Sequence, residues 1–515
     1  METKRPSPVS ICRYGNCAIL LFATIYFFFI PTILLIFYLN DPGLKGQGVP
    51  RFAFRIHRHL APRYEKWARQ RVESGEAKGL TLEQIAATEW PVFGSAFYLW
   101  ATESLQQEWE KDNTLSRVAP KVYAAKSIEA AAALIADPVH AYWVKQHWGE
   151  DYLHKENVFY RMLLIGGLTS YHKLLGGDKY LDLIRDQVET LSKELGESRY
   201  GLLDDYPDQC YPTDVLAAIA AIKRADALLG TDHSEFINRS IRGFEGKLLD
   251  PQTGLPPYFA SAYSGNIDIS RGCSNQWGIT WAAELWPETA KKWYENFEKY
   301  YWQRRFGAVG FREFLKNTGE EDWHIDVDSG PVIAGFGASA CSFGVGVARA
   351  NNRFDNAYPL GAEVITASLP LLDGTLLTAR YLSNAAHAKY TGEACLLFSF
   401  TRMPQGEPIV AQETRLPAIV YWMLALYMLV GVTMVAAAIM MLKNWQKNLS
   451  KKVFRFQKAQ LIIWAALVVA GFVLVILNNL FYGLLLILIA QLLPRFTRIT
   501  IKRQDEPGGL RTFWR

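Results

Sequence analysis

The most constraining feature of this chain is an uncharged, strongly apolar stretch near its N-terminus, residues 17–39 (CAILLFATIYFFFIPTILLIFYL). A helix of that length crosses a hydrocarbon core about 30 Å thick. The stretch exceeds the apolar region of a signal peptide, and no small-residue cleavage site follows it. Two further apolar stretches, residues 416–442 and 459–493, lie near the C-terminus. The sequence therefore predicts an integral membrane protein.

Basic residues next to these stretches predict the orientation. Residues 1–16 carry Lys4, Arg5 and Arg13, and residues 443–458 form a basic loop after the second apolar stretch. An excess of Lys and Arg marks the cytoplasmic side of a spanning helix. We therefore expect the N-terminal tail and this loop in the cytoplasm.

The third stretch is too long for one comfortable span and contains Asn478 and Asn479. Two uncapped amides at bilayer depth would be costly. A helical hairpin with both residues at its outer tip gives four spans and returns the basic tail, residues 494–515, to the cytoplasm. We expect this hairpin, and so four spans; the alternative, one long tilted helix, would give three. In both alternatives residues 40–415 form one domain on the periplasmic or extracytoplasmic side.

The composition of this domain restricts its partners. The net charge of the whole chain is only +5, and no basic helix in this domain is interleaved with aromatics, so nucleic-acid binding is not expected. The membrane lipid and a small-molecule or glycan substrate are the expected partners, and the oligomeric state stays open. Disulfides are permitted on this side of the membrane, and three pairings are open to the cysteines there. These cysteines are Cys210, Cys273, Cys341 and Cys395.

An internal repeat predicts the fold class of the domain. Residues 174–195 (LLGGDKYLDLIRDQVETLSKEL) align with residues 228–249 (LLGTDHSEFINRSIRGFEGKLL), and both contain a turn between two helices. Repeated helix pairs form either a solenoid or a closed toroid. One set of helices is rich in small apolar residues, as an inner ring would be, and the other is amphipathic and charged. We predict an all-α protein whose external domain is an (α/α)6 barrel.

Polar segments precede each predicted inner helix, often with a proline in its first turn. Inner helices that run the same way would bring these segments to one rim of a central cavity. The candidate catalytic residues are Asp205 and Asp214, which we expect to form the acid/base pair, with Asp326, Asp328 and Glu156 in support. The candidate substrate-binding residues are Trp90, Tyr160, Tyr206, Cys210, Asn275 and Trp277.

Each of these acids has a structural alternative, because Asp and Asn before a helix commonly cap it. His324 fits a surface hydrogen bond better than a proton shuttle. The pair Asp326 and Asp328 could hold a divalent cation, but no further ligand cluster accompanies it, so no metal and no cofactor are expected.

Several segments resemble the linalool dehydratase/isomerase family. They are residues 155–180 (KENVFYRMLLIGGLTSYHKLLGGDKY), 204–214 (DDYPDQCYPTD), 250–265 (DPQTGLPPYFASAYSG) and 382–404 (LSNAAHAKYTGEACLLFSFTRMP). The likeness runs in the same order from about residue 89 to residue 404. It implies an (α/α)6 domain outside the cytoplasm that hydrates, dehydrates and isomerises small isoprenoid alcohols without a cofactor.

The resemblance also implies where the site lies. The family uses two cysteines and a histidine, and Asp204 or Asp205 and Asp214 stand where those cysteines would be, unless Cys210 replaces one of them. The histidine position, near Leu163, is apolar here. The leading hypothesis is therefore a membrane-tethered hydro-lyase or isomerase that uses carboxylates for elimination, addition or isomerisation at a C–O bond of a small or lipid-like alcohol.

Two alternatives remain open from the sequence. Carboxylates and aromatics around a cavity also suit a hydrolase, lyase or epimerase that acts on a cell-surface polysaccharide. The third hypothesis is a non-catalytic binding scaffold whose acids all serve as helix caps.

Overall fold

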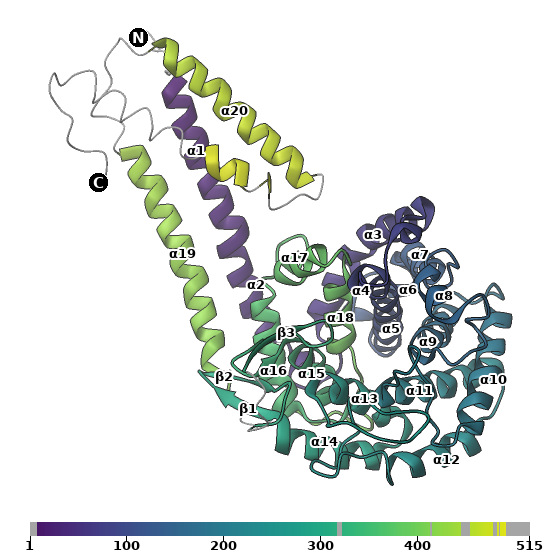
Figure 1. Cartoon of the computed structure of the whole chain (residues 1–515). Helices are drawn as coiled ribbons and strands as arrows, with labels where there is room; N and C mark the ends of the chain where they lie inside the picture. The colour runs from purple at the N-terminus through teal and green to yellow at the C-terminus, as the bar shows by residue number, and fades with distance from the viewer. Residues whose placement is uncertain are drawn as a thin grey trace. The chain divides into compact units, whose positions relative to one another are not determined.

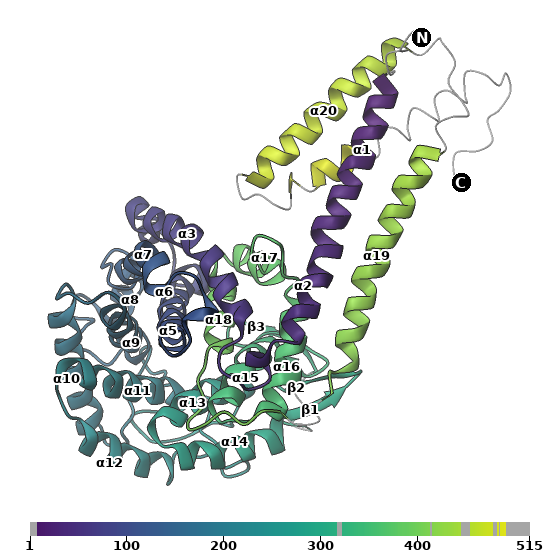
Figure 2. The same cartoon turned by 180° about the vertical axis from the view of Figure 1, so that it is seen from behind.

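The computed structural model describes residues 8–316, 322–411, 415–443, 454–476, 482–483 and 485–490. Within these ranges the chain is mostly helical, with a few short strands, so the prediction of a predominantly helical protein is confirmed. The chain divides into two compact units (Figures 1 and 2). The smaller unit comprises Met1–Thr32 and Ala425–Arg515, and the larger unit comprises Ile33–Leu424.

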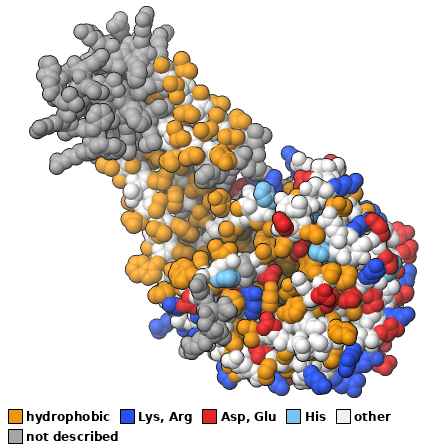
Figure 3. Space-filling model, in the orientation of Figure 1, with side chains coloured by type: hydrophobic (Ala, Val, Ile, Leu, Met, Phe, Trp, Pro, Cys, Tyr) orange, Lys and Arg blue, Asp and Glu red, His pale blue; other side chains and the backbone are white. Residues whose placement is uncertain are grey.

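Helices of the smaller unit are apolar. They are α1 (Pro8–Thr24), η1 (Ile25–Phe29), the start of α2 (Ile30–Leu39), most of α19 (Ala418–Lys443) and α20 (Phe454–Ile476). Two helical segments, Tyr14–Leu39 and Ala418–Met440, are long and apolar enough to cross a membrane. In Figure 3 the side chains along these helices form a nearly continuous hydrophobic surface. The predicted hairpin tip at Asn478 and Asn479 lies outside the described residues.

Pro31 explains why the first apolar helix widens into a π-helix at Ile25–Phe29. Proline has no N–H and its ring clashes with the carbonyl four residues earlier, here that of Phe27. An extra residue in the preceding turn relieves this clash. Thr24 and Thr32 each donate a side-chain hydrogen bond to the carbonyl four residues earlier, at 2.7 Å, so their hydroxyls are satisfied inside the helix.

In the larger unit, six buried helices contact one another in a closed sequence. These are α5 (Trp90–Lys111), α9 (Val158–Leu175), α11 (Pro212–Leu229), α13 (Gly272–Leu285), α15 (Ala338–Ala350) and α18 (Thr391–Phe400). Each packs against the next in this order, and α18 packs against α5. Small residues in α9, α11 and α15 allow the close approach: a Cβ added to Gly166 would lie 2.8 Å from the Trp100 ring.

A second set of helices covers the first from outside, as Figures 1 and 2 show for α7, α10, α12 and α14. This set comprises α3 (Arg51–Ser74), α7 (Ala125–Ile135), α10 (Leu181–Glu197), α12 (Ser234–Phe244), α14 (Pro287–Tyr301), α16 (Phe354–Ala367) and α17 (Leu377–Ala385). The turns between inner and outer helices use left-handed glycines, such as Gly176 and Gly177 after α9 and Gly230 after α11. The two repeated sequences therefore form equivalent helix pairs.

Short elements complete the larger unit. The short helices are η2 (Pro42–Leu44), η3 (Glu76–Gly79), α4 (Ile85–Thr88), η4 (Asn113–Leu115), α6 (Pro120–Tyr123) and α8 (Tyr142–Trp148). The strands are β1 (Trp302–Arg305) and β2 (Ala308–Phe311), which form an antiparallel hairpin, and the antiparallel set β3 (Trp323–Asp326), β4 (Gly330–Ile333) and β5 (Phe336–Gly337).

These strands correct the all-α prediction. Residues 330–350 (GPVIAGFGASACSFGVGVARA) have the small, apolar composition of an inner helix, with Pro331 near the start. Instead, the helix begins at Ala338 and the preceding residues form β4 and β5. Gly330, Ala334 and Gly335 all have positive φ, which breaks a helix and forms the strand turns.

Aromatic side chains fill the middle of the six buried helices. Phe97 and Trp100 of α5 pack against Trp277 and Trp281 of α13, and Phe398 of α18 packs against both pairs. The ring centroids of Trp100 and Trp281 are 4.9 Å apart, in an edge-to-face arrangement. This apolar layer separates the two ends of the helix set.

An ion-pair network lies at the C-terminal ends of the buried helices. Glu103 of α5 accepts from Arg224 of α11 and from Lys173 of α9, the latter at 3.3 Å. Arg224 also pairs with Glu284 of α13 at 3.3 Å, and Glu284 pairs with Arg402 at 3.6 Å. Burial alone would raise the pKa of Glu103, but the charges of Arg224 and Lys173 lower it to about 2.

Candidate functional site

The N-terminal ends of the buried helices meet at the opposite end of the set. The Thr391 hydroxyl at the start of α18 donates to the carbonyl of Trp90 at the start of α5, at 3.2 Å. The Val158 amide at the start of α9 donates to the carbonyl of Asp204, in the segment that leads into α11. The Trp277 indole of α13 donates to Asp214 of α11 at 2.7 Å. The polar segments before these helices therefore form one rim.

Three acids from different elements interact electrostatically at this rim: Glu89 before α5, Asp214 in the first turn of α11, and Asp328 in the β3–β4 turn. Burial raises the pKa of Glu89 to about 8. The Tyr206 hydroxyl donates to Glu89 and opposes this rise, whereas the charges of Asp328 and Asp214 increase it. Burial raises the pKa of Asp214 to about 7, against the Trp277 hydrogen bond and with the help of Asp328. At neutral pH Glu89 therefore tends to hold its proton, and Asp214 holds a proton more readily than an ordinary Asp does.

Asp205 and Asp204 extend this acidic cluster below the rim. Asp205 is 1 % exposed, and its Oδ2 accepts the Tyr211 amide at 2.8 Å. Burial, followed by the charge of Asp214, raises the pKa of Asp205 well above its ordinary value. Burial and the neighbouring Glu156 raise the pKa of Asp204 to about 6. Asp205 thus combines a cap-like hydrogen bond with direct electrostatic coupling to Asp214.

Tyrosines and an arginine border Asp328. The Tyr258 hydroxyl donates to Asp328, and the rings of Tyr258 and Tyr211 pack edge to face with centroids 5.4 Å apart. The Arg271 guanidinium lies 4.3 Å from the centroid of the Tyr258 ring and pairs with the buried Glu313 at 2.8 Å. This side of the rim is aromatic and polar, and Asp328 itself is exposed.

Beneath the acids the surface is apolar. Phe93, one turn into α5, packs against Phe97 and edge to face against Trp277, with ring centroids 4.1 and 5.3 Å apart. Phe93 is partly exposed, whereas Phe97 and Trp277 are buried. A molecule held by Glu89 and Asp214 would therefore lie against aromatic rings.

Several residues predicted for the site have structural contacts instead. Glu156 accepts the Asp204 amide at 2.7 Å. Tyr160 is fully buried and donates to the carbonyl of Ile135 at 2.9 Å. The Asn275 amide donates to two backbone carbonyls at 3.0 Å. The structure thus places these three side chains in the supporting framework rather than among the rim acids.

Cys210 is buried, and its backbone pairs with Ala260. All six cysteines are free thiols, so none of the possible disulfides is formed. Trp90 is partly exposed beside Glu89. Asp326 lies on β3, but its side chain lies outside the described residues. Among the residues that the structure describes, no group of three His, Cys, Asp or Glu side chains is arranged to hold a metal ion.

Sequence reasoning left Glu89, Tyr258 and Tyr211 out of the candidate site. Glu89 has the same sequence context as the acids that were chosen, since it precedes the proline of α5. That context could have identified it. Tyr258 lies in a long loop before α13, and its pairing with Asp328 depends on two segments far apart in sequence, so no local pattern indicates it.

Gly272 positions the Arg271–Glu313 pair, and we expect Gly272→Ala to lower the free energy of unfolding by about 2 kcal/mol, as overpacking a close contact does. A Cβ there would lie 2.0 Å from the carbonyl oxygen of Arg312, and the Gly272 amide donates to the carbonyl of Glu313 at 2.8 Å. Urea denaturation measures the loss. Gly79→Ala is the matched control because a Cβ at Gly79 would meet nothing within 4 Å; equal losses in both variants would contradict this role.

Comparison with known proteins assigns no family: no protein-family model matches the chain, and no curated protein sequence matches it.

Proposed function

We propose that the chain is a membrane-tethered enzyme that uses carboxylates at one rim of an (α/α)6 barrel to break or form a C–O bond. The closed sequence of six buried helices, each covered by an outer helix, supports the barrel. The observation that carries the activity is the cluster of Glu89, Asp214 and Asp328, because its members come from three separate elements: the charges of Asp328 and Asp214 raise the pKa of Glu89, and the charge of Asp328 raises that of Asp214.

Both half-buried acids have a pKa raised toward neutral pH, so each can hold or release a proton during a reaction. Glu89, with a pKa of about 8, holds a proton at neutral pH and serves as the general acid. Asp214, with a pKa of about 7, serves as the base in its ionised fraction. In an elimination, Glu89 protonates the leaving hydroxyl, the C–O bond breaks, and Asp214 removes a proton from the adjacent carbon. The products are an alkene and water, and the reverse steps add water.

An apolar floor favours a small or lipid-like alcohol as the substrate. Phe93, Phe97 and Trp277 lie beneath the acids, and such rings pack well against an unsaturated hydrocarbon. This agrees with the resemblance to linalool dehydratase/isomerase, which we carry forward as a proposal. The basic residues beside the apolar helices support the placement of this unit on the extracytoplasmic side.

One observation favours a glycan as the second candidate substrate. Asp328 is exposed and receives the Tyr258 hydroxyl, with Tyr211 beside them. Paired carboxylates with tyrosines at an open rim suit a sugar, whose leaving oxygen one acid protonates while the other activates water.

A substrate screen on the full chain tests the proposal. The purified protein in lipid nanodiscs is incubated with isoprenoid alcohols such as linalool and geraniol, and gas chromatography with mass spectrometry detects dehydration and isomerisation. A parallel arm measures reducing ends released from acidic and neutral polysaccharides. Turnover in the first arm supports the leading function, and turnover only in the second supports the glycan alternative. No turnover in either arm favours the binding scaffold.

We expect Asp214→Asn to lower the turnover found in that screen by about 10²-fold or more, because the amide cannot accept the substrate proton. Asn keeps an oxygen that can accept the Trp277 indole hydrogen bond, so the melting temperature should change little. Asp205→Asn should also impair turnover, since Asp205 interacts directly with Asp214. Asp208→Asn, at an exposed position of the same loop, is the control. Full activity in the Asp214 and Asp205 variants would remove this assignment.

A further inference from the structure

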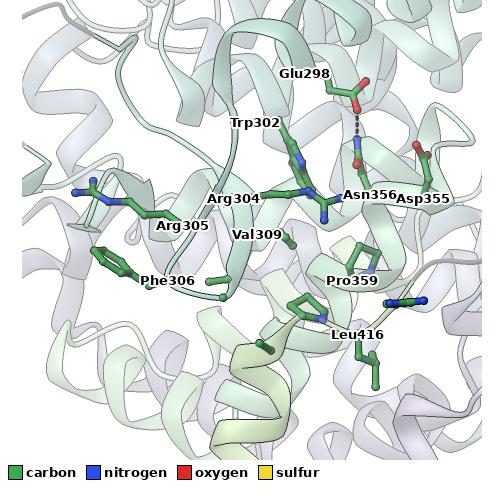
Figure 4. A pocket seen from close by; sticks show the side chains of 15 residues that line it. Glu298, Trp302, Arg304, Arg305, Phe306, Val309, Asp355, Asn356, Pro359 and Leu416 are labelled. Atoms are coloured by element: carbon green, nitrogen blue, oxygen red, sulfur yellow. Dashed lines mark hydrogen bonds between the residues drawn. The ribbon is translucent and has the colours of Figure 1, made fainter.

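A pocket of about 850 Å³ lies in the larger unit, away from the rim acids. Figure 4 shows its walls, which come from the end of β1 and the β1–β2 turn, from α16, and from the first residues of α19. Its volume falls in the range of small-molecule sites. Arg304, Phe306, Asn356 and Leu416 are among the residues that line it.

The charge of this pocket is positive. Its two acids, Glu298 and Asp355, are both paired with Arg353, at 2.7 and 2.8 Å. Among the described residues, no carboxylate pairs with Arg304 or Arg415, although both line the pocket and are exposed. Two exposed guanidinium groups at one pocket are suited to a phosphate, which they can contact through two parallel hydrogen bonds each.

The pocket lies beside the first turn of α19, where a candidate membrane span begins. The Ile419 amide in the first turn of α19 donates to the carbonyl of Gly307 at the hairpin tip, at 3.0 Å. The apolar span begins at Ala418, so the hairpin tip lies at the level where that span would leave the membrane. Tyr421 and Trp422, which follow directly, are 58 % and 70 % exposed. Exposed Tyr and Trp at the end of a span are typical of the lipid headgroup region.

Phe306 also supports a position of the β1–β2 hairpin tip at the lipid headgroup region. It occupies the left-handed position of the β1–β2 turn, with φ of 53°, and 75 % of its surface is exposed. A large aromatic side chain so exposed, between Arg305 and the start of a membrane span, is suited to enter the interface between headgroups and acyl chains. A soluble phosphate compound would gain nothing from Phe306 or from the apolar surface of α19.

From these observations we propose that the pocket bounded by Arg304, Phe306 and Arg415 binds the phosphate headgroup of an anionic membrane lipid, with the acyl chains beginning beside the first turns of α19. The proposal rests on the membrane tethering proposed above, but not on the catalytic roles of Glu89 and Asp214. Such a lipid would fix the β1–β2 hairpin, and with it the larger unit, to the bilayer surface.

Native mass spectrometry of the full chain, released from detergent and titrated with phosphatidylglycerol or phosphatidylcholine, tests the proposal. We expect binding of phosphatidylglycerol at least tenfold tighter than binding of phosphatidylcholine. Arg304→Gln/Arg415→Gln should lose most of this preference, and Arg304→Lys/Arg415→Lys should keep part of it. Arg58→Gln/Arg117→Gln, which removes the same charge from exposed positions elsewhere, should behave like the natural chain.

Three results would overturn the proposal: equal binding of the two lipids, an unchanged preference in the Arg304/Arg415 double Gln variant, or full displacement of the lipid by millimolar inorganic phosphate. A melting curve of each variant verifies that it is folded, and Arg415→Gln alone provides a second variant. Failure of the chain to incorporate into nanodiscs would instead refute the membrane tethering, so the two failures are distinguishable. Unchanged catalytic turnover in the Arg304/Arg415 double Gln variant is compatible with the proposal and separates it from the rim site.

Discussion

Glu89→Gln is expected to reduce turnover by about 10³-fold, because it removes the proton donor while keeping the shape of the side chain. Glu89 is the acid at the rim whose pKa, about 8, keeps it mostly protonated at neutral pH. A Gln amide can still accept the Tyr206 hydroxyl but cannot protonate a leaving oxygen. The measurement is kcat with the substrate that the screen identifies.

The pH dependence of the Glu89 variant separates a catalytic role from a structural one. Since the pKa of Glu89 is raised from 4.5 to about 8 in the folded protein, the folded state binds the proton more tightly than the unfolded state does. The free energy of unfolding should therefore fall as the pH rises from about 4.5 to about 8, and Glu89→Gln should flatten this decline. Turnover should rise as the Asp214 carboxyl ionises near pH 7 and fall above about pH 8.

Glu83→Gln is the matched control, because Glu83 is exposed and lies shortly before Glu89 in the chain. It should leave turnover and the pH profile unchanged. Retention of full turnover by Glu89→Gln would contradict its role as the acid. A large loss of stability at pH 8 would instead indicate a structural role, because loss of a buried charge at that pH should stabilise the fold.

The largest expected effect on stability is that of Glu103→Ala, which should lower the free energy of unfolding by about 3–5 kcal/mol. Glu103 is 4 % exposed and lies between Arg224 and Lys173, and the Ser170 hydroxyl also donates to it. Without Glu103, the half-buried Arg224 keeps only Glu284 as an ionic partner among the residues that the structure describes. Urea denaturation at pH 7 measures the loss.

Glu103 changes the pH dependence of the free energy of unfolding in the direction opposite to Glu89. The pKa of Glu103 is lowered from 4.5 to about 2, so its contribution is present above about pH 4.5 and is lost as the pH falls toward 2. The difference in the free energy of unfolding between the natural chain and Glu103→Ala should therefore shrink as the pH falls through that range. The control is Glu129→Ala, because Glu129 is exposed and its pairing with Arg69 at 3.7 Å contributes less than about 1 kcal/mol. Equal losses in the two variants would contradict the importance of the buried network.

Position at a helix start predicts some of the residues that the structure brings near one another. Asp205, Asp214, Tyr206 and Trp277 all precede or begin helices that the sequence predicts to be inner, and their side chains interact at one rim. The same argument selected Glu156, which caps the Asp204 amide instead, and Tyr160, which hydrogen-bonds to Ile135. A helix start indicates that a polar residue is needed, but the direction of its side chain depends on which neighbour lies beside it.

Some features were decided only by the tertiary structure. The strands of residues 330–337 arise where positive φ values at Gly330, Ala334 and Gly335 interrupt an otherwise helix-like apolar pattern. The pairing of Tyr258 with Asp328 and of Arg224 with Glu103 joins segments far apart in the chain. No local periodicity encodes such contacts, since each depends on how the buried helices close on one another.

The sequence by itself determined the apolar helices, the alternation of buried and amphipathic helices, and the placement of acids at helix starts, because each follows from local composition and a helical period of 3.6 residues. The tertiary structure alone decided which acids interact electrostatically with one another and which accept hydrogen bonds from backbone amides. The reason is physical: the protonation of Glu89 depends on burial and on charges that other segments bring to it, and neither is a property of its own neighbours in sequence.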